Sequence, residues 1–298
     1  MNNETLNACL ICECDSLKPL KKYEKDHLVR CRRCSFVFSN LRPTDEELNQ
    51  TYAAYQRGSN TPTSLTLEKL RVRAEWLCNK TKVRAVLDVG CGDGHFLSMF
   101  FEMGCKVFGT EFDRDSAKAS EAKGAIMLEG GLTPNLPEQI SGFDVIIFTE
   151  VIEHINNPRI VLDHFYKLLN PGGLLFITTP NFDGLERFML GPGWGMIMYP
   201  EHISYYSPCT LDYVLEVSRM KKVETYTENI SLFRIVQFLN KFRKSAYVDP
   251  EGISAQAQSI ASQNKVAKLM KSGINGFLRA SNLGSSIVSV YQKNNDHA

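Results

Sequence analysis

The feature of this chain that most constrains its fold is a regular alternation of short apolar segments with helical segments, beginning near residue 85. Strands are predicted at Ala85–Val89, Lys106–Glu111, Ala125–Leu128, Phe143–Thr149 and Leu174–Thr179. Helices are predicted between them, at Phe96–Met103, Asp115–Lys123 and Pro158–Leu169. Strands that alternate with helices form a parallel sheet covered by helices, so the sequence predicts an α/β fold.

The pattern changes after residue 179. Residues 183–208 are rich in glycine and aromatic residues and show no clear element, and a connection of this length is usually functional. A helix at Leu211–Val217 and strands at Lys222–Glu228 and Ser286–Lys293 are predicted beyond it. A mostly helical, basic insertion at about 231–280 is expected before the last strand.

The cysteines are unevenly distributed, because five of the nine lie within the first 34 residues. Cys9 with Cys12, and Cys31 with Cys34, form two C-x2-C pairs that are 18 residues apart, a spacing typical of zinc ribbons. Four thiolates complete a tetrahedral site, so the predicted zinc is structural. The alternative is two reduced pairs without a metal. Cys14 could replace Cys12 as a ligand, but Cys12 keeps the regular spacing, so Cys14 is predicted to be a bystander.

A glycine-rich turn, LDVGCGDG at residues 87–94, joins the first predicted strand to its helix, and Glu111 ends the next strand. Such glycines let the backbone approach a ligand, and an acid in this place can bind both hydroxyls of a ribose. The turn reads GxGxG, not the GxGxxG of dinucleotide sites. Asp88 and Asp93 suit the ammonium group of a methionine moiety better than a phosphate, so S-adenosylmethionine is favoured over a dinucleotide. The alternative is a tight turn beside a surface glutamate.

These motifs resemble those of class I S-adenosylmethionine-dependent methyltransferases. LDVGCGDG and GTEFD (109–113) are similar to the first two motifs of that family. FDVIIFTEVIEHINNP (143–158), LLNPGGLLFITTPN (168–181) and the final SSIVSVYQK resemble its fourth, fifth and antiparallel last strands. The resemblance implies a Rossmann-like sheet of seven strands, mostly parallel, with S-adenosylmethionine as the cofactor. It implies that the cofactor-binding residues are Asp88, Gly90, Gly92, Glu111, Phe112, Gly130, Gly131, Leu132, Thr149 and Glu150.

A narrower resemblance covers nearly the whole chain. The cysteine pairs, the segment RPTDEELNQTYAAY (42–55) and PEHISYYSPCTLDYVLE (200–216) are similar to bacterial methyltransferases that act on sugars and related surface-glycan or secondary-metabolite precursors. Some members methylate carbon and carry a large C-terminal domain that is not in this sequence, which leaves O-methylation of a sugar or sugar-derived molecule favoured.

Two histidines are the candidates for chemistry, because methyl transfer to a hydroxyl needs an aligned nucleophile and removal of its proton. His202, in the irregular segment, is predicted to be a base or a ligand; the alternative is a loop histidine packed on an aromatic ring.

Glu150 and His154 belong to an E-x-x-E-H pattern that resembles the metal-binding motif of small-RNA 2′-O-methyltransferases and some ubiquinone-pathway O-methyltransferases. The resemblance implies a second divalent site at Glu150, Glu153, His154 and His202. The alternative places Glu150 near the cofactor and makes the other two structural.

The charge is unevenly spread, although the net charge is only +1. Residues 1–42 carry +3, residues 43–230 carry −8 and residues 231–298 carry +6. The basic insertion is either a solvated helical face or an attractor for a phosphate-bearing acceptor.

Two further functions remain open: an RNA 2′-O-methyltransferase that uses the ribbon as a clamp, and a non-catalytic adaptor. The modest ribbon charge disfavours nucleic acid, and the intact glycine turn disfavours the adaptor.

The predicted organisation is a zinc ribbon at 1–42, a helical linker or lid at 43–80 and a methyltransferase domain at 81–298. Thr44–Glu47 has the pattern of a capping box at the start of the linker. The chain has no apolar run of the roughly 18–20 residues that span a bilayer, and its start lacks the pattern of a signal peptide. A cytoplasmic location is therefore expected.

Overall fold

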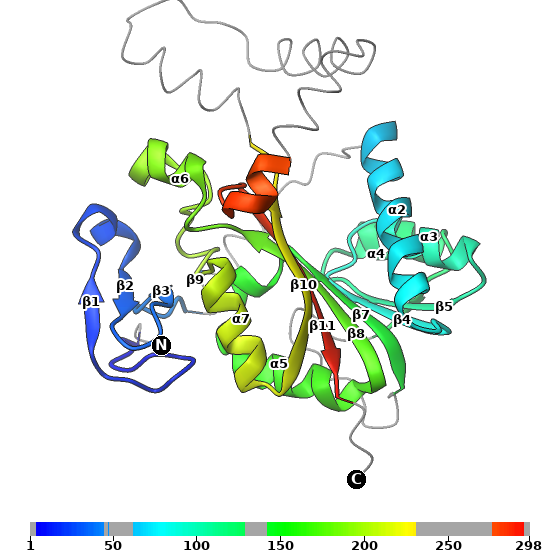
Figure 1. The fold of residues 1–298 in the computed structure, drawn as a ribbon, viewed down its shortest axis with the longest axis horizontal. Coiled ribbons are helices and arrows are strands. Elements are labelled where there is room, and N and C mark those ends of the chain that lie inside the picture. The colour runs from blue at the N-terminus through cyan, green and yellow to red at the C-terminus, as the bar shows by residue number, and fades with distance from the viewer. Residues whose placement is uncertain (1–3, 45–46, 48–61, 129–141, 231–275, 295–298) are drawn as a thin grey trace, which may run out of the picture.

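The computed structural model describes residues 4–44, 47, 62–128, 142–230 and 276–294, and its centre is a mixed sheet (Figure 1). The strand order is β10-β11-β8-β7-β4-β5-β6. The bounds are β4 (Ala85–Val89), β5 (Lys106–Thr110), β6 (Ile126–Met127), β7 (Phe143–Thr149), β8 (Leu169–Pro180), β10 (Met220–Glu228) and β11 (Ser286–Lys293). The pairs from β6 to β8 are parallel, and β11 is antiparallel to both of its neighbours. The predicted Rossmann-like sheet is confirmed.

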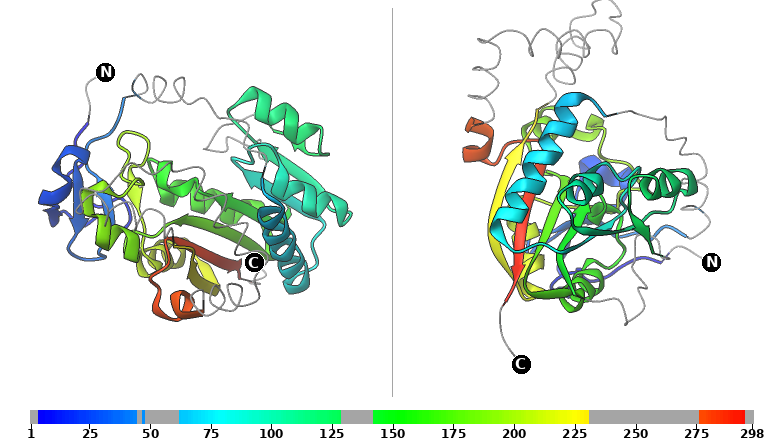
Figure 2. Two further views of the ribbon diagram at one scale, coloured as in Figure 1. Left: turned by 90° about the horizontal axis from the view of Figure 1, so that it is seen from above. Right: turned by 90° about the vertical axis from the view of Figure 1, so that its right-hand side faces the viewer.

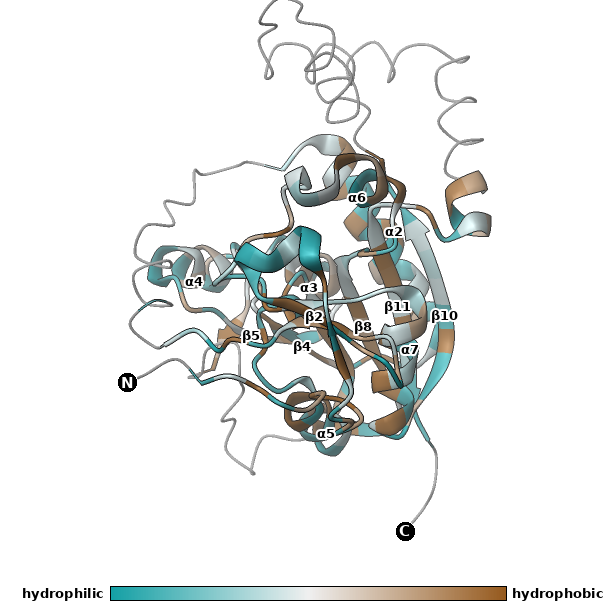
Figure 3. Cartoon of the chain, turned by 90° about the vertical axis from the view of Figure 1, so that its left-hand side faces the viewer, coloured by the Kyte–Doolittle hydropathy of each residue, from teal (hydrophilic) through white to brown (hydrophobic). Residues whose placement is uncertain are grey.

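Helices cover both faces of this sheet, as the alternating sequence pattern predicts. One face carries α2 (Ser64–Lys80) and α3 (His95–Glu102), and the other carries α5 (Pro158–Leu168) and α7 (Pro208–Val217). Among the described residues, α4 (Arg114–Glu121) is a further helix next to the sheet. Successive strand residues point to opposite faces, so Val145 and Ile147 pack with α3 while Ile146 and Phe148 pack with α5. Brown, hydrophobic strands β4 and β8 therefore lie inside, whereas edge strand β10 is largely hydrophilic (Figure 3).

The helices begin where their sequences cap them. Asn157 accepts a hydrogen bond from the Ile160 amide, and Pro158 occupies the first helical turn of α5. Thr44 and Glu47 form the predicted capping box, since the Glu47 amide donates to Thr44 Oγ1 at 3.2 Å and the Thr44 amide donates to Glu47 Oε2 at 2.8 Å. The rest of that predicted helix lies outside the described residues. So do the loop at 129–132 and most of the insertion, residues 231–275.

A second, small sheet contains the N-terminal cysteines and has the order β1-β2-β3-β9. Its strands are β1 (Leu17–Pro19), β2 (Leu28–Cys31), β3 (Val37–Ser39) and β9 (Ser204–Tyr205), with the 3-10 turn η1 (Lys21–Asp26) between the first two. The N-terminal unit, residues 4–42, is called the cysteine ribbon below. It lies at the opposite end of the large sheet from α2 (Figures 1 and 2). Its fourth strand, β9, comes from a distant part of the chain.

The segment 183–208, for which the sequence predicted no element, is more ordered than expected. It contains α6 (Leu185–Leu190), the 3-10 turn η3 (Gly191–Gly193) and β9. Trp194 is only 1% exposed and packs with Phe182 and Tyr205. The prediction missed this order because the segment is stabilised by contacts with the ribbon, not by a periodic pattern of its own. No helix in the described parts of the chain is long and apolar enough to cross a membrane.

Candidate active site and metal centres

The carboxyl ends of β4, β7 and β8 open into a cavity of about 320 Å³, the position in which open α/β sheets bind ligands. The structure brings three predicted residues together here: Asp88, Thr149 and Glu150. The other residues that line the cavity are Leu70, Arg73, Cys91, His95, Phe96, Thr178, Glu228, Asn229, Ser286 and Val288.

The glycine turn lies beside the cavity and holds Glu111. Gly90 and Gly92 have φ values of 76° and 53°, a backbone conformation that favours glycine. The Gly92 amide donates to Glu111 Oε2 at 2.8 Å, and the Phe112 and Asp113 amides donate to Oε1 at 2.8 and 3.0 Å. These three backbone amides hold the Glu111 carboxylate beside the glycine turn, where the sequence resemblance implies a ribose-binding acid.

Asp88 is the most unusual group in the cavity. The residue is 2% exposed, and Oδ1 has no hydrogen-bond partner within the part of the chain that the structure describes. Burial, together with the nearby charge of Glu111, raises the pKa of Asp88 to about 8. A buried acceptor is normally satisfied, so an unpaired carboxylate oxygen at a cavity wall fits a donor that arrives with a ligand, such as an ammonium group.

Glu150 lies at the end of β7 with a positive φ of 54°. Glu150 lines the cavity and is exposed there. Thr178 Oγ1 donates a hydrogen bond to Glu150 Oε1 at 2.7 Å. Desolvation in the cavity raises the pKa of Glu150, while the Thr178 hydrogen bond and the charge of Arg73 oppose this shift. Residues held in this backbone region cluster at functional sites, which is consistent with a role for Glu150 at the cavity.

The cavity also contains a cation that the sequence analysis missed. Arg73 on α2 forms an ion pair with Glu228 on β10 at 2.7 Å, and both side chains are largely buried. The guanidinium also lies over the Phe176 ring, 5.7 Å from its centroid. Arg73 lies three residues after Leu70 in the predicted helical linker at 43–80. An arginine one helical turn after an apolar residue was the signal in the sequence for this cation.

A second cluster lies next to the cavity and joins Glu153, His154 and His202. One ligand atom from each lies within 4.8 Å of the others, and this cluster is called the histidine site below. The centroids of the His154 and His202 rings are 4.6 Å apart. Glu150 is not part of this group. It has a positive φ and precedes the helical turn η2 (Ile152–His154), and the structure does not group it with the other three residues of the predicted second divalent site.

Both histidines are oriented by backbone carbonyls. His154 Nδ1 lies 3.0 Å from the Glu201 carbonyl oxygen, and His202 Nδ1 lies 2.9 Å from the Met196 carbonyl oxygen. A carbonyl only accepts, so each Nδ1 carries the proton and each Nε2 is the basic nitrogen. Burial lowers the pKa of His202, which favours the neutral ring. A backbone carbonyl on the second nitrogen is the usual support of a metal-binding histidine.

Glu153 completes the histidine site from a buried position. It is 2% exposed and accepts a hydrogen bond from Thr179 Oγ1 at 3.0 Å. Burial, with the nearby charge of Glu150, raises the pKa of Glu153 well above its usual value. A cation at the histidine site would stabilise the ionised form of this carboxylate.

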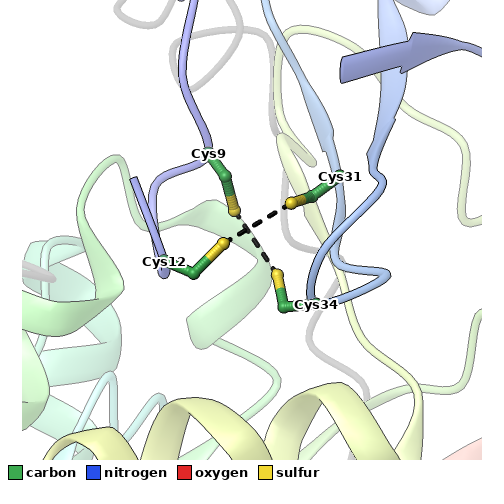
Figure 4. Close-up of side chains that lie close together, drawn as sticks. All are labelled: Cys9, Cys12, Cys31 and Cys34. Atoms are coloured by element: carbon green, nitrogen blue, oxygen red, sulfur yellow. Dashed lines mark hydrogen bonds between the residues drawn. The ribbon is translucent and has the colours of Figure 1, made fainter. Parts of the chain in front are cut away.

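The four predicted zinc ligands converge on one point (Figure 4). The sulfurs of Cys9 and Cys34, and of Cys12 and Cys31, are 3.5 Å apart, and all four lie within 4.8 Å of one another. Four sulfurs at 2.3 Å from a tetrahedral zinc would be about 3.8 Å apart, so the residues fit this metal. Hydrogen bonding from the Cys34 side chain lowers the pKa of Cys9, and the Ile11 and Cys12 amides act in the same direction. Cys14 stands outside the group.

The sheet order, the antiparallel β11 and the glycine turn at the cavity define a Rossmann-like methyltransferase fold. A family model described as "Methyltransferase domain" matches residues 60–217, just over half of the chain. The chain therefore belongs to this methyltransferase-domain family.

Curated relatives support the cofactor class. A probable S-adenosylmethionine-dependent methyltransferase of Mycolicibacterium smegmatis is 25% identical over 150 residues, which cover 50% of this chain and 56% of the relative. The mitochondrial ubiquinone biosynthesis O-methyltransferase of Rattus norvegicus is 31% identical over 128 residues, 40% of this chain and 35% of the relative. The ubiquinone biosynthesis O-methyltransferase of Xylella fastidiosa strain M23 is 27% identical over 192 residues, which cover 60% of this chain and 76% of the relative. The chain thus spans about half or less of the first two relatives.

Solved structures confirm the fold alone. A putative sarcosine dimethylglycine methyltransferase from Galdieria sulphuraria has a TM-score of 0.51 at 17% identity, covering 78% of this chain and 85% of its own. The [4+2]-cyclase SpnF also has a TM-score of 0.51, at 14% identity, covering 85% and 97%. Since a cyclase shares the fold, the reaction has to be argued from the site residues.

We expect metal analysis of the purified protein to find about one zinc bound by the cysteine ribbon. Cys31→Ser should remove that zinc, because it leaves three thiolates, whereas Cys14→Ser should retain it as the matched control. Wild-type protein that is fully folded and free of zinc would contradict this assignment.

Asp88 should make the cofactor-free protein less stable as the pH rises. Its carboxyl group holds a proton up to about pH 8 when folded but loses it near pH 4 when unfolded, so the unfolded state binds fewer protons between these values. The free energy of unfolding should fall by up to about 1.4 kcal/mol per pH unit from this group. Urea unfolding from pH 5 to pH 8 should show a smaller fall for Asp88→Asn. An equal fall in both proteins, with Asp115→Asn as the exposed control, would contradict the assignment.

Proposed function

We propose that the protein is an S-adenosylmethionine-dependent methyltransferase that methylates a hydroxyl oxygen of a small molecule. The observation that carries this proposal is the buried Asp88 oxygen, which has no partner among the described residues and lies at a cavity beside the glycine turn. The names of the rat and Xylella relatives, both O-methyltransferases, support the choice of oxygen as the acceptor atom. A sugar or sugar-derived acceptor, with or without a phosphate, is the finer proposal and rests on the sequence resemblance.

Two residues of the cavity, and Glu111 beside the glycine turn, fit the three polar parts of the cofactor. Asp88 would hold the ammonium group, Arg73 the carboxylate, and Glu111 the ribose hydroxyls. When bound, S-adenosylmethionine supplies the methyl group from its sulfonium. Phe112, which is 69% exposed, and the residues Gly130, Gly131 and Leu132, outside the described residues, complete the proposed cofactor set.

The histidine site adjoins the cavity through neighbouring residues of β8. Thr178 donates to Glu150, which faces the cavity, and Thr179 donates to Glu153, which belongs to the histidine site. An acceptor hydroxyl that lies between the two would reach the basic Nε2 of His154 or His202. The lowered pKa of His202 keeps its ring neutral and able to take a proton near neutral pH.

A divalent ion is the second way in which the histidine site could serve the same reaction. Two imidazole nitrogens and one carboxylate are a ligand set that suits Mn²⁺, Fe²⁺, Co²⁺ or Zn²⁺ better than Mg²⁺. An ion there would lower the pKa of a bound hydroxyl. Glu153, His154 and His202 would hold it, and Glu150 would remain with the cofactor cavity.

Calorimetry with S-adenosylmethionine tests the proposed cofactor site. Wild-type protein should bind it, and Glu111→Ala should weaken binding by tenfold or more, since charge-assisted hydrogen bonds contribute about 1.5–3 kcal/mol. Glu121→Ala, an exposed glutamate on α4, is the control and should bind normally. Absence of binding by the folded wild-type protein would overturn the proposed function.

Titration with Mn²⁺, followed by electron paramagnetic resonance, tests the divalent ion. Zinc-loaded wild-type protein should bind about one Mn²⁺, and Glu153→Gln should weaken that binding at least tenfold because it removes the only anionic ligand. Glu224→Gln, an exposed glutamate on β10, serves as the control. Equal binding by all three proteins would leave the histidines to act as bases without a metal.

A further inference from the structure

The cysteine ribbon and the histidine site are joined by a shared sheet. Val37 and Phe38 of β3 pair with Tyr205 and Ser204 of β9, and the Ser39 amide donates to the Ile203 carbonyl at 2.9 Å. The two-residue strand β9 begins two positions after His202. A strand of this length depends on its partner for stability, so the position of the His202 turn depends on β3.

The side chain of Tyr205 extends this link to His202 itself. Its hydroxyl donates to the His202 carbonyl at 2.9 Å, and its ring is 4% exposed among Tyr23, Val37 and Phe182. Tyr23 and Val37 belong to the cysteine ribbon. The residue that anchors the His202 backbone is therefore itself anchored by the ribbon.

A separate contact holds the turn that carries Glu153 and His154. Arg42, at the end of the ribbon, donates to Asn156 Oδ1 at 2.6 Å and to the Asn156 carbonyl. Arg159, at the start of α5, donates to the Ile11 carbonyl at 3.3 Å and forms an ion pair with Glu13 at 2.8 Å. The ribbon therefore contacts the chain on the C-terminal side of His154 at two points.

The ribbon also shares its core with this turn. Cys9, Ile11 and Cys31 are buried in one apolar cluster with Val151 and Ile152. The two turns of the histidine site are bonded to each other, since the Ile203 amide donates to the Glu153 carbonyl at 3.0 Å. A segment of about 40 residues builds little core of its own, so the metal of the cysteine cluster would keep this assembly in place.

We infer that the metal-loaded cysteine ribbon is a clamp that positions both turns of the histidine site and thereby sets the affinity of that site for its ligand. Arg42 and Tyr205 are positioning residues of this clamp. Where the ligand is a divalent ion, the inference rests on the proposed function, but the positioning itself does not.

The test uses the full-length, zinc-loaded protein with Arg42→Ala, the conservative Arg42→Lys, and Arg32→Ala, an exposed arginine of the same ribbon, as the matched control. Arg42→Ala should retain its zinc and should bind S-adenosylmethionine within twofold of wild type. Its affinity for Mn²⁺ should fall about tenfold, the lower end of the effect of losing a group bonded to a metal ligand, because Arg42 acts through Asn156 on the turn that carries His154. Arg42→Lys should recover part of the affinity, and Arg32→Ala should match wild type.

Hydrogen exchange provides a readout that needs no ion at the histidine site. The amides of His154 and Ile203, bonded to the Val151 and Glu153 carbonyls, should exchange at least tenfold faster in Arg42→Ala and after removal of the ribbon zinc with an organomercurial. If zinc removal unfolds the protein, the Arg42 variants decide the question. Unchanged exchange of both amides in Arg42→Ala would overturn the clamp. Faster exchange in a protein whose wild type binds no Mn²⁺ would support the clamp and reject only the divalent ion.

Discussion

The parallel register of β4, β7 and β8 is the constraint on which both candidate sites depend. Asp88 pairs with Ile147, and Thr149 pairs with Thr178, so the carboxyl ends of three strands meet at one edge of the sheet. The residues that follow each strand must then gather there. The glycine turn, the Glu150–His154 segment and the end of β8 become neighbours for this reason, although they are far apart in sequence.

Two buried carboxylates give these sites their chemical character. Asp88 and Glu153 are each 2% exposed, and burial raises the pKa of each. A fold tolerates such groups at a cost in stability, which a bound cation offsets. An ammonium group beside Asp88 and a metal ion or protonated base beside Glu153 would each do so. Under the proposed function, Asp88 belongs to the cofactor site and Glu153 to the adjacent acceptor site.

The cysteine ribbon is an integral part of this arrangement and not an attached module. Its sheet is completed by β9, and its cysteines pack in the same cluster as Val151 and Ile152. The predicted domain boundary at residue 42 follows the sequence composition. Residues on both sides of this boundary nevertheless contribute to the same small sheet and to the same apolar cluster. Whether the two turns of the histidine site keep their positions would therefore depend on whether the four thiolates hold a metal ion.

The sequence by itself determined the local features: the strand and helix pattern, the glycine turn, the capping box at Thr44 and the two cysteine pairs. Each follows from periodicity or from spacing over a few residues, which the chain encodes directly. Only the tertiary structure decided the ion pair of Arg73 with Glu228, the joining of β9 to β3, and the separation of Glu150 from His154. These depend on packing between segments far apart in the chain, and on one positive φ at Glu150, which no local pattern specifies.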